Sequence, residues 1–227
     1  MLNSIIQQRG QVAFPAFMAE RVYMREFRKE TGLPADLARW QPTVDAMLAG
    51  VDTDLPIFIM VDQGIVQPGN SHRRPGLHID GYWHPMKAMH RGYGEHRNHP
   101  SPWRQEEDRK RRQEEGRHSN TPARHSTSRS GWDVGNGWAH GDFSEPEALI
   151  LASDIAASRA LSGVYYEMPG EGGDCTHVNV EGMSEVILRA NTVYTGNVTM
   201  LHESLPVTAA CQRTLVRLSV PGWTPEV

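Results

Sequence analysis

The sequence predicts a mainly β protein with helices at its N-terminal end. Outside residues 84–146, short runs rich in Val, Ile, Leu and Thr follow one another from residue 55 onward. Turn residues separate the runs, and no long helical pattern lies between them, which favours an antiparallel sandwich or barrel. The predicted strands are 55–62, 148–153, 161–168, 175–180, 186–188, 193–202 and 214–220.

The N-terminal helices are predicted from the spacing of apolar side chains. Residues 14–31 carry Phe17, Val22 and Phe27 at roughly helical intervals, and Gly-Leu-Pro ends the pattern. Residues 35–48 predict a second helix that Pro42 kinks or restarts. Helices that precede a β core are expected to cover one sheet.

Length and composition indicate one domain. The 227 residues fit a single unit, with 1–54 as helical support and 84–146 as an insertion. The two cysteines, Cys175 and Cys211, form no disulfide framework, which favours a reducing compartment. The sequence shows no membrane-spanning run and no signal-peptide pattern, so we expect a cytoplasmic protein, with a virion component as the alternative location.

The predicted insertion differs from the rest of the chain in charge. Residues 86–131 hold 11 Lys/Arg and 6 Asp/Glu, whereas the whole chain has a net charge of −4. The long stretch predicts a lid or a partly disordered loop. Its histidines match no zinc spacing. Its arginines permit contact with nucleic acid, but interleaved acidic residues do not favour it.

Two His-x-Asp pairs are candidate metal ligands. In a strand, His78 and Asp80 would face the same side, and one His with one carboxylate supplies two ligands for iron. His140 and Asp142 form a rival pair in a glycine-rich setting. We favour His78 and Asp80, because they follow an apolar strand and a turn, and keep the rival open.

The last two predicted strands supply the remaining candidates. His202 ends an apolar run and is the proposed third ligand. Arg213, Arg217 and Ser219 share one face of the final strand with Leu215. Burying two arginines in a β core requires partners, and a carboxylate ligand is one such partner.

This set resembles the Fe(II)- and 2-oxoglutarate-dependent oxygenases. The segment from His202 through Pro206 to Arg213 is similar to their prolyl-hydroxylase-like branch, and the likeness covers roughly residues 55–83 and 147–221. It implies a double-stranded β-helix core of the jelly-roll or cupin-like type. It also implies a dioxygenase that uses Fe(II), 2-oxoglutarate and O₂ to hydroxylate a substrate, which is a protein side chain, a nucleobase or a small molecule.

The resemblance also implies residue roles. His78, Asp80 and His202 are the expected catalytic metal ligands. Arg213 is the expected anchor for the far carboxylate of 2-oxoglutarate, and the sequence leaves Arg217, with Ser219, as a competing anchor. For the near end of 2-oxoglutarate the candidates are these two residues: Tyr194 and Asn197.

Two other functions stay open at this point. The first is a catalytically silent β-helix domain that serves as a structural or binding subunit of a larger assembly, such as a virion. The second is a cupin-like metal protein that does not use 2-oxoglutarate. The segment 71–76, rich in His and Arg, could position an anionic substrate, although a solvated loop is the simpler interpretation.

Overall fold

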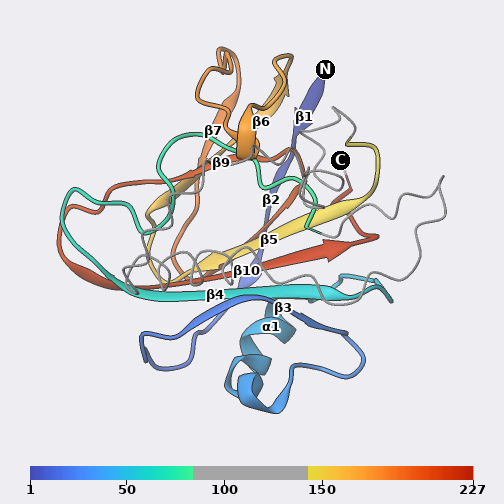
Figure 1. Ribbon diagram of the computed structural model, residues 1–227, viewed down its shortest axis with the longest axis vertical. Coiled ribbons are helices and arrows are strands. Elements are labelled where there is room, and N and C mark those ends of the chain that lie inside the picture. Colours follow the sequence, from blue (N-terminus) through green and yellow to red (C-terminus); the bar gives the residue numbers. More distant parts are fainter. Residues whose placement is uncertain (84–142, 227) are drawn as a thin grey trace, which may run out of the picture.

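Residues 1–83 and 143–226 are described by a computed structural model, and they form two antiparallel sheets with one short α-helix (Figure 1). In these residues the larger sheet has six strands in the order β2-β8-β5-β10-β4-β3. Its strands are β2 (Ile6–Gln11), β3 (Arg21–Phe27), β4 (Ile57–Val66), β5 (Glu147–Ser153), β8 (Thr192–Asn197) and β10 (Cys211–Pro221).

The smaller sheet is built around β6 (Ser158–Tyr165). The first half of β6 pairs with β7 (Ser184–Ile187) and with β9 (Leu201–Ser204), and its last residues pair with β1 (Leu2–Ser4). In Figure 1 this sheet lies opposite the larger one, and the segment that leads into residue 83 runs between them.

Alternation along the central strands sends different residues to the two faces of the larger sheet. One face packs against the helical segment, which consists of the 3₁₀-helix η1 (Ala35–Trp40) and α1 (Gln41–Met47). Its core contains Trp40, Ile59 and Val216, and Trp40 Nε1 donates a hydrogen bond to Glu20. The opposite face of β10 carries Arg213, Leu215 and Arg217 into the space between the sheets.

A second apolar cluster fills part of the space between the sheets. Leu149 and Leu151 of β5 meet Ala160 of β6, together with Tyr194 and Met200. This cluster closes part of the space, and the remainder is lined by polar side chains from β9 and β10 and by Met60 of β4.

The predicted helix at 14–31 is wrong, because this region contains the strand β3. The strand pairs with β4 along the edge of the larger sheet, and its register shifts between Val22 and Arg25. Ala19 and Met24 have positive φ angles of 52° and 45°. The bulge disturbs the alternation that marks a strand, and the apolar residues then imitate helical spacing.

The second predicted helix is confirmed, and Pro42 restarts it as expected. Residues 35–40 form the 3₁₀ turn, and α1 begins at Gln41 with Pro42 in its first turn. Proline is tolerated there because the first amide groups of a helix have no carbonyl partner within it.

The strand predictions are confirmed for β4, β5 and β10, and altered elsewhere. The run 161–168 is shifted to Ser158–Tyr165, 186–188 corresponds to Ser184–Ile187, and 193–202 is two strands joined by a turn at Asn197 and Met200. The strand predicted at 175–180 is wrong, since only Asp174 makes a bridge beside it.

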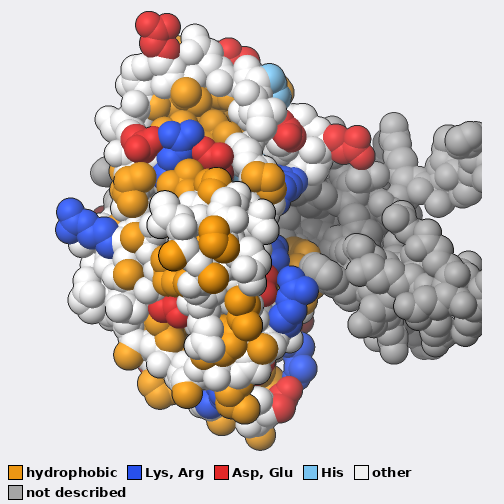
Figure 2. All heavy atoms as spheres, turned by 90° about the vertical axis from the view of Figure 1, so that its left-hand side faces the viewer, with side chains coloured by type: hydrophobic (Ala, Val, Ile, Leu, Met, Phe, Trp, Pro, Cys, Tyr) orange, Lys and Arg blue, Asp and Glu red, His pale blue; other side chains and the backbone are white. Residues whose placement is uncertain are grey.

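Most of the predicted insertion 84–146 lies outside the described residues, as does the rival pair His140 and Asp142. Within the parts of the chain that are described, no helix is both long and apolar enough to cross a membrane. On the face shown in Figure 2, hydrophobic side chains are scattered among charged ones, and Lys and Arg side chains gather along one border.

Candidate metal centre

The segment around His78 joins the smaller sheet through single bridges rather than a full strand. The backbones of His78 and His202 exchange two hydrogen bonds of 3.0 Å, and His78 also forms a bridge with Asp174. The amide of Ile79 donates to Gly173 O at 2.9 Å. The sequence predicts a strand at His78, but His78 forms only isolated bridges. The bridges to Asp174 and His202 hold its backbone in place.

These pairings bring together the three residues predicted as ligands. His78, Asp80 and His202 each offer a ligand atom, and these atoms lie within 4.8 Å of one another. The two imidazole rings are 4.5 Å apart between centroids. Two histidines and one carboxylate on one side of a cavity are the donor set of a non-haem Fe(II) site.

Hydrogen bonds fix which ring nitrogens face the centre. His78 Nδ1 lies 2.8 Å from Gly76 O, and His202 Nδ1 lies 3.0 Å from Met200 O. A carbonyl oxygen only accepts, so each Nδ1 carries the hydrogen and Nε2 is the atom available to a metal. Metal-binding histidines are commonly oriented in this way by a bond from the other ring nitrogen.

The electrostatics of the site suit a neutral histidine and an ionised carboxylate. Burial, and then the charge of His202, lowers the pKa of His78 to about 3, so its ring is neutral at pH 7. Burial alone would raise the pKa of Asp80, but Arg217, followed by the two histidines, holds it well below its usual value. These are the protonation states that metal ligation requires.

A cation fits between the ligand atoms. His202 Nε2 lies 3.4 Å from Asp80 Oδ2, and two acceptor atoms at that separation repel unless a proton or a cation lies near both. Asp80 Oδ2 is also buried without an aligned hydrogen bond, although Arg217 Nη1 is 2.6 Å away. The residues present therefore suit a divalent ion bound by nitrogen and oxygen.

Arg213 is fully buried and has no carboxylate partner among residues 1–83 and 143–226. Its guanidinium donates to three serine hydroxyls: Ser153 at 3.3 Å, Ser204 at 3.0 Å and Ser158 at 2.8 Å. Burial lowers the pKa of Arg213, and the charge of Asp154 opposes this shift. A buried guanidinium that is bound only by neutral hydroxyl groups keeps its full charge. An anion that binds beside it therefore stabilises it.

A cavity of about 220 Å³ joins the metal ligands to the serines around Arg213. Arg217, the other candidate anchor, lines this cavity but is already paired with Asp80. The residues of the cavity wall that bear on the chemistry are His78, Asp80, His202, Ser153, Ser204 and Tyr194.

The three remaining sequence candidates have different positions. Tyr194 lines the cavity, and its hydroxyl accepts a hydrogen bond from the amide of Arg189. Ser219 is buried near Asp80 but outside this cavity wall. Asn197 binds the backbone of Asn3 and Ile5, so its role is to hold the N-terminal strands.

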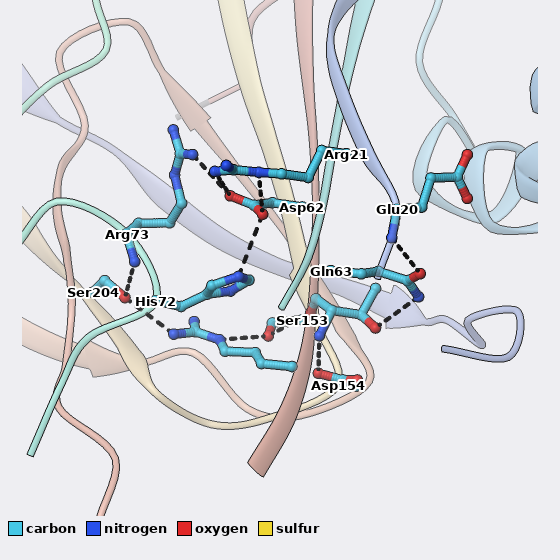
Figure 3. A network of polar contacts seen from close by, with 11 residues as sticks. Glu20, Arg21, Asp62, Gln63, His72, Arg73, Ser153, Asp154 and Ser204 are labelled. Atoms are coloured by element: carbon cyan, nitrogen blue, oxygen red, sulfur yellow. Dashed lines mark hydrogen bonds and ion pairs between the residues drawn. The ribbon is translucent and has the colours of Figure 1, made fainter. Parts of the chain in front are cut away.

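A polar network that sequence reasoning missed holds the segment 71–76 against the sheet (Figure 3). Asp62 of β4 accepts hydrogen bonds from Arg21 and Arg73, and His72 Nε2 is 3.4 Å from its carboxylate. The amide of Arg73 donates to Ser204, the same hydroxyl that Arg213 binds. Figure 3 shows these residues converging from both sheets. Through Ser204, the segment that leads to His78 is therefore linked to Arg213.

The serines around Arg213 were also not predicted from the sequence. Only part of the information that places them beside Arg213 lies in neighbouring residues of the sequence. Ser153 ends a predicted strand and Ser204 follows His202 by two residues, and this is the local part of the signal. Their approach to Arg213 depends on the pairing of β5 with β10 and of β6 with β9, which short-range patterns do not specify.

The chain matches no protein-family model, no curated protein and no solved structure.

Proposed function

We propose that the protein is an Fe(II)- and 2-oxoglutarate-dependent oxygenase. The observation that carries this proposal is one cavity that joins His78, Asp80 and His202 to the surroundings of Arg213. A metal-ligand set alone would suit several kinds of metal protein. The buried guanidinium without a carboxylate partner in the described residues adds a place for the acidic co-substrate.

The arrangement of strands supports a double-stranded β-helix core as part of this proposal. Two antiparallel sheets face each other, and the chain passes between them repeatedly. His78 and His202 lie on paired segments of the smaller sheet, while Arg213 comes from β10 of the larger sheet. The candidate ligands and the candidate anchor therefore reach the space between the sheets from opposite sides.

His78, Asp80 and His202 would hold the metal through two Nε2 atoms and a carboxylate oxygen. When bound, Fe(II) supplies the redox chemistry by which R–H, 2-oxoglutarate and O₂ become R–OH, succinate and CO₂. The carbonyl oxygens of Gly76 and Met200 keep the imidazoles turned toward the centre. Apolar neighbours such as Leu151 and Leu215 limit water in the same cavity.

Arg213 would bind the far carboxylate of 2-oxoglutarate. Its guanidinium has no competing carboxylate in the described residues, and the hydroxyls of Ser153, Ser158 and Ser204 can rotate to donate to the ligand. Arg217 is the weaker candidate because its charge is already neutralised by Asp80 at 2.6 Å.

The test is anaerobic titration with Fe(II) followed by 2-oxoglutarate. We expect a weak visible charge-transfer band and a higher melting temperature. A ligand at a hundred times its Kd stabilises the folded state by about 2.7 kcal/mol. For a chain of this size that corresponds to about 5–10 °C.

Three variants separate the roles. His202→Ala should abolish stoichiometric Fe(II) binding, and Arg213→Met should keep the metal but lose the band and the stabilisation by 2-oxoglutarate. His177→Ala is the matched control, because this exposed histidine lies outside the cavity wall. Equal metal binding by wild type and His202→Ala would overturn the metal site. If wild type and Arg213→Met respond equally to 2-oxoglutarate, Arg213 does not bind the co-substrate. The protein would then be a metal protein of another kind.

A further inference from the structure

The cavity wall carries more positive than negative charge. Its charged residues other than histidine are four arginines and two carboxylates. These residues are Arg73, Arg74, Arg189, Arg217, Asp80 and Glu203. Positive charge in a cavity with apolar walls raises the local concentration of anions.

Ion pairs account for only part of this charge. Asp80 is paired with Arg217, and Glu203 is paired with Arg159, which lies outside the cavity wall. Arg73 is paired with Asp62 at 2.9 Å. Two guanidinium groups, those of Arg74 and Arg189, then remain without an ion pair to any described residue.

Arg74 is held next to the metal ligands by the backbone. Its Nη1 donates to Gly172 O at 3.0 Å, and the next residue, Gly173, accepts from the amide of Ile79. A carbonyl partner orients the guanidinium without forming an ion pair, and after hydrogen bonds to that carboxylate, the charge of Arg74 is one of the causes that hold the pKa of the exposed Asp174 below its usual value. Because Arg74 precedes His78 by four residues and contacts the segment bridged to it, its charge lies at the metal end of the cavity.

Arg189 reaches the cavity from the connection between β7 and β8. Its amide donates to the hydroxyl of Tyr194 at 3.0 Å, and the preceding residue, Leu188, donates to Ser158 O. These bonds hold the backbone from which the guanidinium of Arg189 extends. Both Arg74 and Arg189 are exposed, so they lie where a ligand enters rather than in the buried part that Arg213 occupies.

We propose that Arg74 and Arg189 form a second anion subsite at the cavity mouth, and that the substrate is a small organic molecule carrying a carboxylate or phosphate group. This inference rests on the proposed function for the role of substrate. The co-substrate 2-oxoglutarate brings two carboxylates, one for the metal and one for Arg213, and leaves the two mouth arginines without an ion pair to the described residues. The anionic group of the substrate binds them and holds a C–H bond at the metal for hydroxylation.

The size of the cavity limits the group that enters it to a small one. A volume of about 220 Å³ is below the roughly 300–1,000 Å³ of pockets that enclose drug-sized ligands. A compact acid or phosphate ester is small enough to enter such a space. The subsite supplies recognition by charge, and the apolar residues Met60 and Leu215 contact the remainder of the substrate.

The experiment is calorimetric titration of inorganic phosphate and, separately, of L-malate. Each is titrated into protein loaded anaerobically with Fe(II) and saturating 2-oxoglutarate, at fixed ionic strength. We expect one of the two probes to bind, and Arg74→Gln with Arg189→Gln to weaken that binding at least tenfold. The probe that binds tells a phosphate-bearing from a carboxylate-bearing substrate. Arg9→Gln is the matched control, because Arg9 also donates to a backbone carbonyl but lies outside the cavity wall.

The outcomes separate this subsite from the proposed function. Failure of both probes to bind, or equal binding by wild type and the double variant, would overturn the subsite. The double variant should retain the 2-oxoglutarate affinity of wild type, and a tenfold loss of that affinity would place Arg74 and Arg189 in the co-substrate site instead. If 2-oxoglutarate does not bind wild type, the proposed function fails. The probes are then titrated into Arg213→Met protein, in which a tenfold loss on changing the two mouth arginines still supports an anion subsite.

Discussion

Arg217 neutralises Asp80, the carboxylate that the described residues offer to a metal beside His78 and His202. Asp80 Oδ2 lies 2.6 Å from Arg217 Nη1, and both side chains are largely withdrawn from water. The pairing of Arg217 with Asp80 could not be predicted from the sequence. Alternation along the strand places Arg213 and Arg217 on the same face, so both were candidates for binding the carboxylate of 2-oxoglutarate. The candidate ligands were predictable, because His78 and Asp80 are two residues apart in one run and His202 ends an apolar run.

Replacing Arg217 by Met should destabilise the metal-free protein. Asp80 would be left as a buried charge without its guanidinium, and breaking such a pair costs about 3–5 kcal/mol in the free energy of unfolding. Fe(II) should restore part of the loss, because it supplies positive charge to the same carboxylate. Urea denaturation with and without Fe(II), under anaerobic conditions, measures both effects.

Arg25→Met is the control for this variant. Arg25 pairs with Asp36 on the surface, where the two side chains are 50% and 59% exposed, so the loss should be below about 1 kcal/mol. Equal losses for the two variants, or a wild-type stability for Arg217→Met, would contradict a structural role for the Asp80 pair.

At the scale of elements, Asp62 holds the segment 71–76 against β4 through His72 and Arg73. Burial alone would raise the pKa of Asp62, but His72, Arg21 and Arg73 hold it well below its usual value. This network was not predictable, because its members come from three separate parts of the chain. The strand β3, which supplies Arg21, was itself mistaken for a helix, since its bulge hides the alternation of a strand.

Asp62 should make stability depend on pH. A carboxyl group whose pKa is lower in the folded state binds fewer protons there than in the unfolded chain. Its stabilisation is complete above the unfolded pKa of about 3.9 and is lost as the pH falls below it. In urea denaturation at pH 7, 5, 4 and 3, wild type should exceed Asp62→Asn at pH 7, and the gap should narrow from about pH 4 downward. A constant gap across this series would exclude Asp62 as the titrating group.

Gly173 allows the segment of Ile79 to approach closely. A Cβ at Gly173 would lie 2.2 Å from Ile79 O, and its φ angle is +79°. We therefore expect Gly173→Ala to displace His78 and to lower Fe(II) affinity at least tenfold, as measured by anaerobic titration.

Gly69→Ala separates the steric clash from backbone strain. Gly69 has the same φ of +79° but nothing within 4 Å of the added methyl group. It should lose about 1–2 kcal/mol of stability from strain and keep its metal affinity. Equal affinities for the two variants would show that the close approach at Gly173 does not position His78.

At the scale of the whole molecule, residues 1–83 and 143–226 contain both sheets and all three candidate ligands. The residues on either side of 84–142 are close together: Tyr82 donates to Glu145 O at 2.9 Å, and the amide of Trp83 donates to the carboxylate of Glu147 at 2.9 Å. A short linker can therefore replace 84–142. The sequence predicted this division from composition, since 84–146 lacks the apolar alternation of the rest.

Protein in which Gly-Ser-Gly-Ser replaces residues 84–142 should fold and bind Fe(II) with an affinity within about threefold of wild type. The core clusters and the ligand set lie outside the deleted part, which is why both should persist. Circular dichroism and anaerobic titration measure the two properties. An unfolded product, or a folded one without metal binding, would show that the deleted residues complete the domain.

The backbone bridge between His78 and His202 also sets the order in which the site can appear during synthesis. The two residues are 124 positions apart, and closing so long a loop costs conformational entropy before any contact repays it. A growing chain carries His78 and Asp80 without their third partner until the 124 residues up to His202 have been added. With the proposed function, a metal is held by all three residues only after β9 has emerged and paired, so we expect metal loading to follow that pairing.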